Sequence, residues 1–247
     1  MCNLYSMMSN KDAIREFARF LRTTSGSDNL ETQPDIFANG FGPIVRATPE
    51  GRELAIARWG MPSSEDAIGT KNYDNGTTNI RRTWLPHWKP YLDIENRCVV
   101  PATSFAEPDQ VGKTFKNYWF ALDETRPLFF FAGIWTPQWT SVRKVKEGET
   151  TSDLYGFLTT APNAEVGQYH DKAMPVILRT PEEVETWFTL PVKDIKEFQK
   201  SKTLPDGTLK IVATGLKWDP PTATPSHLKD KPAQAPVPAP PTQPDLF

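Results

Sequence analysis

Cysteine is scarce in this sequence of 247 residues, which contains only Cys2 and Cys98. One pair cannot form the disulfide framework of a secreted protein, so the composition favours a reducing, cytoplasmic compartment. Cys98 stands in the apolar segment "NRCVVPA" and is expected to pack as a small hydrophobic residue. No apolar run approaches the roughly 18 residues of a membrane span, and no basic leader precedes the first apolar stretch. We therefore expect no membrane segment and no signal peptide.

Histidine is equally scarce, with only His87, His170 and His227. Neither the histidines nor the cysteines have the spacing of a metal-binding motif, and there is no glycine-rich phosphate loop. We therefore expect neither a metal nor a cofactor. The net charge of −2 shows no global attraction to polyanions, so a nucleic-acid surface would have to be a local patch.

Composition divides the chain into two regions. Residues 220–247 are rich in proline and alanine and hold almost no large apolar groups before the end. Such a segment cannot bury enough surface to offset its chain entropy, so it is expected to be a disordered tail. Residues 1–219 carry periodic apolar patterns and are expected to form one folded domain.

Within that domain, three segments have helical patterns. Ser9 is the expected N-cap of the first, and Thr180 with Glu183 forms a capping box at the second. The expected helices cover residues 9–22, 180–190 and 194–201.

Segments rich in β-branched and aromatic residues are more numerous and predict strands. Residues 117–135 have the pattern of a hairpin with a short polar turn. The expected helices lie among the expected strands without a regular strand–helix–strand alternation. The predicted class is therefore α+β, with a mostly antiparallel, barrel-like sheet and peripheral helices. The expected strands cover residues 53–61, 97–105, 117–123, 127–135, 154–161 and 209–214.

Cys2 directly follows the initiator methionine. Removal of Met1 would leave a 1,2-aminothiol, whose amino group has a pKa of about 7.7–8.0 against about 10.4 for lysine. This amine can form a Schiff base with an aldehyde, and the thiol can close on the imine carbon to give a thiazolidine. The pattern is that of an aldehyde trap, although position alone favours an ordinary chain terminus or a buried first strand.

Two side chains could move protons during imine formation. His170 lies in "GQYHDKAMPVIL", and Glu107 ends the apolar segment "VVPATSFAEP". Partial burial would raise the pKa of Glu107 toward neutrality. A solvated glutamate at a strand end is the simpler alternative.

The segment "TTNIRRTWLPHWKPYLDIENR" mixes cations with aromatic residues. Guanidinium groups that hold phosphates and rings that stack on bases suit single-stranded nucleic acid. An amphipathic helix with core tryptophans is an equal alternative. The candidate contacts are Arg81, Arg82, Trp84 and Lys89.

Taken together, "MCNLYS", "GPIVR", "ARWGMP", "TNIRR", "RCVVPATSFAEP", "FFFAGIW" and "HDKAMPVIL" resemble the SRAP (SOS-response-associated peptidase) family, or abasic-site processing proteins. The resemblance implies covalent capture of abasic sites in single-stranded DNA, with lyase and self-peptidase activity as further implications. The implied partner is single-stranded DNA containing abasic sites. The expected location is the cytoplasm, in association with the nucleoid, and a monomer is the simplest expectation for an oligomeric state that the sequence leaves open.

By this resemblance, Cys2 is the nucleophile and Asn79 orients the sugar. Arg81 contacts a phosphate, Glu107 shuttles protons, and His170 assists ring opening. Trp59 and Pro43 match positions near the DNA-binding face. The sequence departs from the family pattern at Asn3, Leu4, Ile80 and Pro108.

The chain ends in "QPDLF", in which Gln243, Asp245, Leu246 and Phe247 resemble a bacterial sliding-clamp peptide, whereas Pro244 departs from it. A chance ending is the alternative.

Two other functions remain open for the whole chain. A thiol peptidase using Cys2, His170 and Glu107 would cleave peptides in trans. A non-catalytic single-strand binder would bind intact and abasic strands alike.

Overall fold

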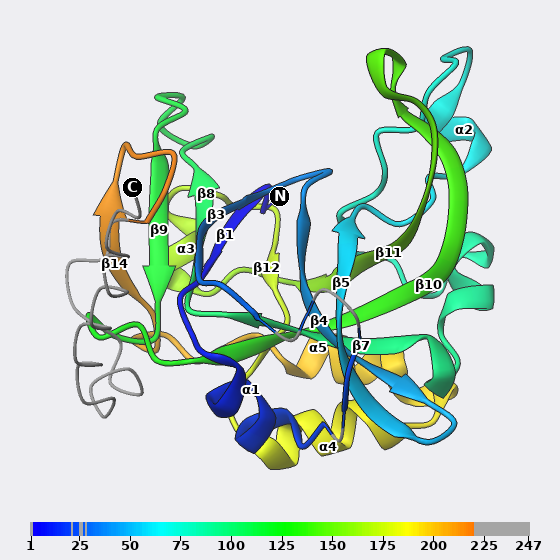
Figure 1. Ribbon diagram of the computed structural model, residues 1–247. Helices are drawn as coiled ribbons and strands as arrows, with labels where there is room; N and C mark the ends of the chain where they lie inside the picture. The colour runs from blue at the N-terminus through cyan, green and yellow to red at the C-terminus, as the bar shows by residue number, and fades with distance from the viewer. Residues whose placement is uncertain (1, 21, 25–26, 28, 220–247) are drawn as a thin grey trace, which may run out of the picture.

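The computed structural model describes residues 2–20, 22–24, 27 and 29–219. Its centre is a five-stranded barrel in which the strands follow the order β11-β10-β7-β4-β5 (Figure 1). Parallel pairing of Leu154 and Tyr155 with Arg58 and Trp59 joins β11 back to β5 and closes the ring. The other pairings in the ring are antiparallel. The barrel strands are β4 (Phe41–Thr48), β5 (Gly51–Trp59), β7 (Arg97–Ala102), β10 (Phe129–Lys144) and β11 (Gly148–Thr160).

A second, five-stranded sheet lies beside the barrel, with the order β14-β9-β8-β1-β3 and antiparallel pairing throughout. The chain passes from barrel to sheet at Thr103, between β7 and β8. These strands are β1 (Leu4–Met7), β3 (Gln33–Phe37), β8 (Ser104–Pro108), β9 (Asn117–Ala121) and β14 (Lys210–Thr214). The predicted class, α+β with a mostly antiparallel, barrel-like core, is confirmed.

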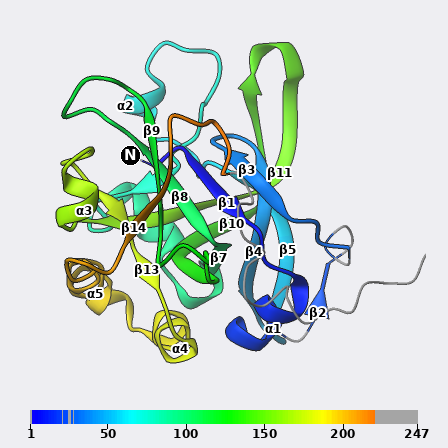
Figure 2. The same ribbon diagram turned by 90° about the vertical axis from the view of Figure 1, so that its left-hand side faces the viewer.

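The remaining elements are short and peripheral, and α1 and α4 lie together at one end of the barrel (Figures 1 and 2). The α-helices are α1 (Lys11–Ala18), α2 (Glu65–Ile68), α3 (Ala164–Gly167), α4 (Pro181–Thr189) and α5 (Ile195–Ser201). The short strands are β2 (Arg22–Thr23), β6 (Asn79–Ile80), β12 (Met174–Pro175) and β13 (Ile177–Leu178). The 3-10 helices are η1 (Pro86–Tyr91), η2 (Ile94–Asn96), η3 (Val145–Glu147) and η4 (Val192–Asp194).

Hydrogen bonds at the first turns explain where the helices begin. The Thr180 hydroxyl accepts from the Glu183 amide at 3.2 Å, which confirms the predicted cap of α4. The predicted cap of α1 is wrong by one residue. Asn10, not Ser9, is the N-cap, because its side-chain oxygen accepts from the Ala13 amide at 2.9 Å.

The predicted hairpin over residues 117–135 is also wrong. β9 pairs with β8 and β14 in the second sheet, whereas β10 pairs with β7, β11 and β13. The hairpin that forms is β10–β11, which extends past the barrel as an exposed arm (Figure 1). Sequence pattern missed the arm because a strand pair with two solvated faces has no apolar alternation.

An aromatic cluster attaches β1 to the barrel. The Tyr5 ring forms T-shaped contacts with the rings of Trp59 and Phe131, at centroid distances of 5.2 and 5.7 Å. Its hydroxyl lies 2.6 Å from that of Tyr155 on β11. Because all four side chains are buried, β1 and the residues before it are held in a fixed position. Cys98 is buried as predicted.

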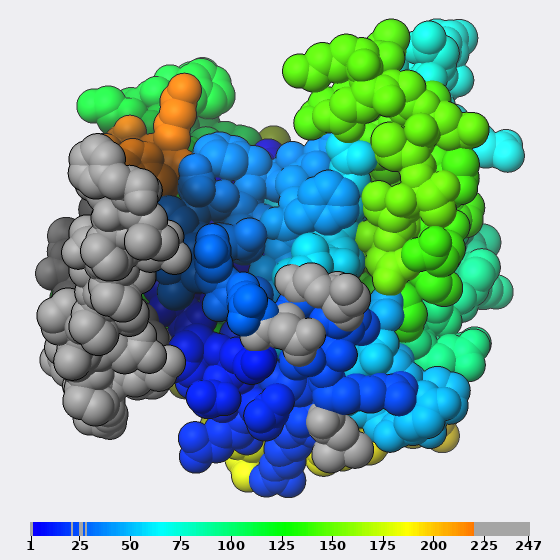
Figure 3. Space-filling view, viewed as in Figure 1, coloured from blue at the N-terminus to red at the C-terminus, as the bar shows by residue number. Residues whose placement is uncertain are grey.

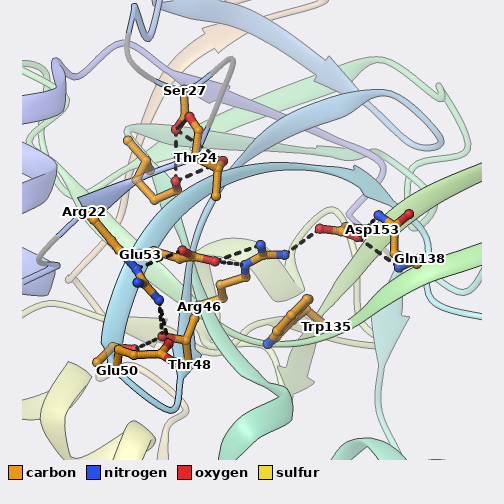
Figure 4. A network of polar contacts seen from close by, with 12 residues as sticks. Arg22, Thr24, Ser27, Arg46, Thr48, Glu50, Glu53, Trp135, Gln138 and Asp153 are labelled. Carbon is orange, nitrogen blue, oxygen red and sulfur yellow. Dashed lines mark hydrogen bonds and ion pairs between the residues drawn. The ribbon is translucent and has the colours of Figure 1, made fainter.

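A polar network joins neighbouring barrel strands (Figure 4). Arg46 of β4 forms ion pairs with Glu53 of β5, at 2.8 Å, and with Asp153 of β11. Its guanidinium carbon lies 4.2 Å from the ring centroid of Trp135 on β10. One arginine therefore links four of the five barrel strands.

Among the described residues, no helix is long and apolar enough to cross a membrane. The predicted disordered tail and the clamp-like peptide at its end lie outside the described residues.

Candidate functional site

The amino-terminal segment begins in a hollow of the molecule. In Figure 1 the start of β1 lies between the loop that joins β8 to β9 and the β10–β11 arm, and Figure 3 shows the surface hollowed between them. Pairing of Leu4 with Ala106 sets β1 beside β8. The Cys2 side chain is buried, and its thiol donates weakly to the Leu4 carbonyl at 3.4 Å.

Asn79 joins this segment to the barrel. β6 runs parallel to β11, with Asn79 opposite Phe157. The side-chain amide of Asn79 donates to the Cys2 carbonyl and to the Thr78 hydroxyl, each at 2.7 Å. Its carbonyl oxygen is buried and has no hydrogen-bond partner among the described residues. That oxygen can accept a hydrogen bond from a ligand hydroxyl.

Glu107 and His170 meet in the same region. Glu107 lies near the end of β8, and its Oε2 is 3.9 Å from Nδ1 of His170, with both side chains fully buried. The Tyr169 carbonyl accepts from the amides of Gln110 and Val111 at 2.8 and 3.2 Å. The loop that follows Glu107 therefore fixes the backbone that carries His170.

Burial controls the protonation of these groups. It raises the pKa of Glu107 to about 8, against an opposing effect of the positive amino terminus. It lowers the pKa of His170 to about 4. Burial, with a contribution from Glu107, also raises the pKa of the Cys2 thiol well above its usual range. At neutral pH the site holds a neutral imidazole, a thiol and a carboxyl group that can donate a proton.

The structure thus brings together Cys2, Asn79, Glu107 and His170, which the sequence spreads over most of the domain. Asn79 also lines cavities of about 250 and 430 Å³.

The mixed cationic and aromatic segment borders the larger cavity. Arg81 and Arg82 line it, while Trp84 and Lys89 are exposed nearby and Trp88 is buried. The segment is not the amphipathic α-helix of the alternative interpretation. Pro86 and Pro90 favour the short 3-10 helix η1, in which a single tryptophan enters the core.

Two residues that were expected near the DNA-binding face, Trp59 and Pro43, are buried in the structure. Trp59 is fully buried, where it stacks on Phe157 at 5.1 Å and donates to the Thr78 carbonyl. Pro43 is buried in β4. Both side chains are therefore buried in this structure, and their expected place near the DNA-binding face stays a prediction.

Sequence analysis missed Gln199 on α5. Its buried side-chain amide reaches the carbonyls of Ile80, Arg81 and Thr159 at 2.9, 3.1 and 2.6 Å. Its oxygen accepts from the Thr83 hydroxyl at 2.9 Å. No motif marks this residue, since a polar residue in a short amphipathic helix is normally solvated.

Among the described residues, no three histidine, cysteine or acidic side chains lie close enough together to hold a metal ion.

The fold and site define a class of barrel proteins that hold a cysteine near the amino terminus, Cys2, beside an asparagine, a carboxyl group and an imidazole. The chain belongs to the SOS response associated peptidase (SRAP) family, whose model matches residues 1–214. This confirms the resemblance found in the sequence. The family is named for its association with the bacterial response to DNA damage.

Solved structures are similar in fold. A protein from Bordetella bronchiseptica is 22% identical with a TM-score of 0.61, covering 85% of this chain and 97% of that one. A protein from Bacteroides thetaiotaomicron is 24% identical with a TM-score of 0.61, covering 85% and 90%. A phage-related protein from Bordetella bronchiseptica is 18% identical with a TM-score of 0.56, covering 85% and 92%. A search of curated proteins finds no match.

Proposed function

We propose that this protein captures abasic sites in single-stranded DNA through a thiazolidine formed by Cys2 after removal of Met1. The observation that carries the proposal is the burial of Glu107 and His170 beside the first residues of the chain. With an aldehyde, an amino-terminal cysteine can form a thiazolidine and an internal cysteine cannot, because only the terminal nitrogen is an amine. An abasic site supplies that aldehyde without a base to displace.

The chemistry proceeds in three balanced steps. The Cys2 amine adds to the aldehyde carbon of the ring-opened sugar and gives a carbinolamine. Glu107, held neutral by burial, donates a proton to the hydroxyl group as water leaves, and its carboxylate then takes the proton from the nitrogen, so that the neutral imine forms and Glu107 is regenerated. The Cys2 sulfur then adds to the imine carbon while its proton passes to the nitrogen, so that aldehyde and aminothiol yield thiazolidine and one water.

The neighbouring side chains have separate tasks in this proposal. The free side-chain oxygen of Asn79 accepts from a sugar hydroxyl, while its amide holds the Cys2 carbonyl. His170, neutral at physiological pH, assists opening of the sugar ring by accepting and returning a proton. Arg81 contacts a phosphate, and Arg82, Trp84 and Lys89 extend the surface for the strand.

Removal of Met1 is the first requirement, because the Cys2 nitrogen is otherwise an amide. We assign to Glu107 the assistance of this hydrolysis, in which water is consumed and free methionine leaves. The product amine then already lies beside the side chains that use it.

The central experiment is a denaturing gel of the purified protein with abasic and intact single-stranded oligonucleotides. We expect a hydroxide-stable crosslink with the abasic strand only. Cys2→Ala should abolish it, whereas Cys98→Ala, which changes the other buried cysteine, should retain it. Full crosslinking by Cys2→Ala, or an uncleaved Met1 in the crosslinked species by mass spectrometry, would overturn the proposal.

The competing functions have distinct outcomes in the same assays. A thiol peptidase using Cys2, His170 and Glu107 would cleave unrelated peptides, and a non-catalytic binder would ignore the loss of Cys2. Strand cleavage on the gel would reveal abasic-site lyase activity.

We further propose that residues 1–219 are the folded domain and that residues 220–247 serve as a tether. Its terminal Gln243, Asp245, Leu246 and Phe247 would dock on a bacterial sliding clamp and raise the local concentration of the domain at replicating DNA, in the cytoplasm and near the nucleoid. Fluorescence anisotropy of a tail peptide with the host clamp tests this. An absence of binding at high micromolar clamp would contradict it.

A further inference from the structure

A cavity of about 160 Å³ is lined by Arg81 but not by Asn79. It is formed where the end of β11 meets α5. The residues that line it are Arg81, Trp84, Thr159, Thr160, Ala161, Gln199 and Lys200. No acidic side chain is among them, so the cavity favours an anionic ligand.

The cations around the cavity are available to a ligand. Arg81 forms no ion pair with any described residue, and burial lowers the pKa of its guanidinium. Lys200 pairs at 3.0 Å with Glu197, but that pair is solvent-exposed and therefore weak. A phosphate can draw both cations without breaking a strong interaction.

The cavity also has a flat apolar wall and a buried donor. Nζ of Lys196 lies over the Trp84 ring, 5.2 Å from its centroid. The side chain is still 49% exposed, so part of the ring surface is open. The Thr159 hydroxyl is buried without a hydrogen-bond partner among the described residues. Cations, an open indole and an unused hydroxyl are the components of a nucleotide site.

The position of the cavity relative to the proposed capture site is set by strand register. β6 and β11 run parallel, with Asn79 opposite Phe157 and Ile80 opposite Leu158. Arg81 and Thr159 follow at the next positions, so they lie about 7 Å along the strands from Asn79. This is the length of one extended nucleotide.

We propose that the cavity is a subsite for the nucleotide next to the captured sugar. Trp84 stacks on its base, and Arg81 and Lys200 hold its phosphate. The inference rests on the proposed function for the placement of the damaged sugar at Asn79, while the stacking and phosphate contacts stand on the cavity itself.

The test measures non-covalent affinity in the full chain carrying Cys2→Ala, by fluorescence anisotropy. The probes are single-stranded oligonucleotides with a central tetrahydrofuran abasic analogue. In two further probes, the neighbouring nucleotide on the 5′ or on the 3′ side also lacks its base. Trp84→Ala should weaken binding of the first probe by roughly 5- to 100-fold, the range of one stacked base.

Comparing the effect of Trp84→Ala across the three probes identifies which neighbouring base stacks on Trp84. With one of the two base-free probes, Trp84→Ala should change the affinity less than twofold, because no base remains to stack. Trp84→Phe should restore most of the affinity. Trp218→Ala is the matched control, since Trp218 is a similarly exposed tryptophan, at 47%, on the segment after β14. Lys200→Ala should reduce the slope of log affinity against log salt by about one.

The subsite is overturned if Trp84→Ala weakens binding no more than Trp218→Ala, or if its effect is the same with all three probes. The proposed function fails separately, on the gel, if the wild-type chain makes no crosslink. A protein that loses affinity through Trp84→Ala but never crosslinks would retain the subsite and lose the capture chemistry.

Discussion

At the scale of single residues, burial gives Glu107 properties that its sequence position only suggests. A carboxyl group with a pKa of about 8 stays neutral in the fold but ionises near pH 4.5 when the chain unfolds. Between these values the folded state binds more protons, so the free energy of unfolding falls as pH rises. For His170, with a pKa of about 4, the opposite slope holds between about pH 4 and 6.5.

Between pH 6.5 and 8 the slope from His170 has ended and the slope from Glu107 remains, with a smaller change from the amino terminus near pH 8. We predict that the wild-type free energy of unfolding falls by up to about 2 kcal/mol across this window, and that Glu107→Gln removes most of the decline, because the amide does not ionise. Urea denaturation at four pH values measures it, with the amino-terminal residue of each sample fixed by mass spectrometry.

Glu147→Gln is the matched control for this prediction. Hydrogen bonds from Lys144 and Arg58 lower the pKa of Glu147 to about 2, so this carboxylate does not titrate in the window. Its replacement should shift the whole curve and leave the slope unchanged. A decline in Glu107→Gln equal to that of the wild type would contradict the assignment.

At the scale of elements, the two-residue strand β6 is too short to hold its own position. It presents Asn79 and leads into Arg81, and it depends on pairing with β11 and on the side chain of Gln199 from α5. Since Gln199 touches neither Cys2 nor the open cavity beside Asn79, we regard it as a positioning residue.

We predict that Gln199→Leu lowers the free energy of unfolding by about 1–3 kcal/mol, because backbone carbonyls lose a buried donor. It should also slow crosslinking at saturating oligonucleotide. Urea denaturation and a timed gel series measure the two effects.

Ser201→Ala provides the control within the same helix, since the Ser201 hydroxyl donates to the Phe198 carbonyl alone, at 2.8 Å. We expect a loss below about 1 kcal/mol and unchanged crosslinking. If Gln199→Leu loses stability but crosslinks at the wild-type rate, the residue stabilises the fold without positioning the site.

At the scale of the whole molecule, the end of the described chain is anchored to the second sheet. Asp219 is buried and receives bonds from Nε and Nη2 of Arg126, at 2.7 and 2.9 Å, and from the Ser104 hydroxyl at 2.6 Å. Its amide donates to the Pro34 carbonyl at 3.2 Å. The segment after β14 is thereby joined to residues near β3, β8 and β10, which supports a domain that extends through residue 219.

We predict that Asp219→Ala lowers the free energy of unfolding by about 3–5 kcal/mol, because it leaves the Arg126 charge buried without its carboxylate. Glu50→Ala should lose less than about 1 kcal/mol, since its pair with Arg22 is solvent-exposed. Urea denaturation of both variants tests the comparison, and equal losses would show that the buried pair is not an anchor.

The sequence by itself predicted β5, β7, β9, β14 and the barrel parts of β10 and β11, but not β3, β4 or the arm. It also determined where α4 begins and to which family the chain belongs. These properties depend on local chemistry: side-chain alternation, the cap at Thr180, and the residue types around Cys2, Asn79, Glu107 and His170. They can be recognised without knowing which segments meet.

Only the tertiary structure decided the strand partners, the burial of Trp59 and Pro43, and the chemistry of the pocket. Pairing of β5 with β11 joins residues far apart in the chain, and no local pattern specifies that contact. The pKa values of Glu107 and His170 depend on solvent exclusion by several elements at once. Gln199 acts through three carbonyl groups whose backbone is brought together by folding, because hydrogen bonding and desolvation are set by distance in space rather than by separation along the chain.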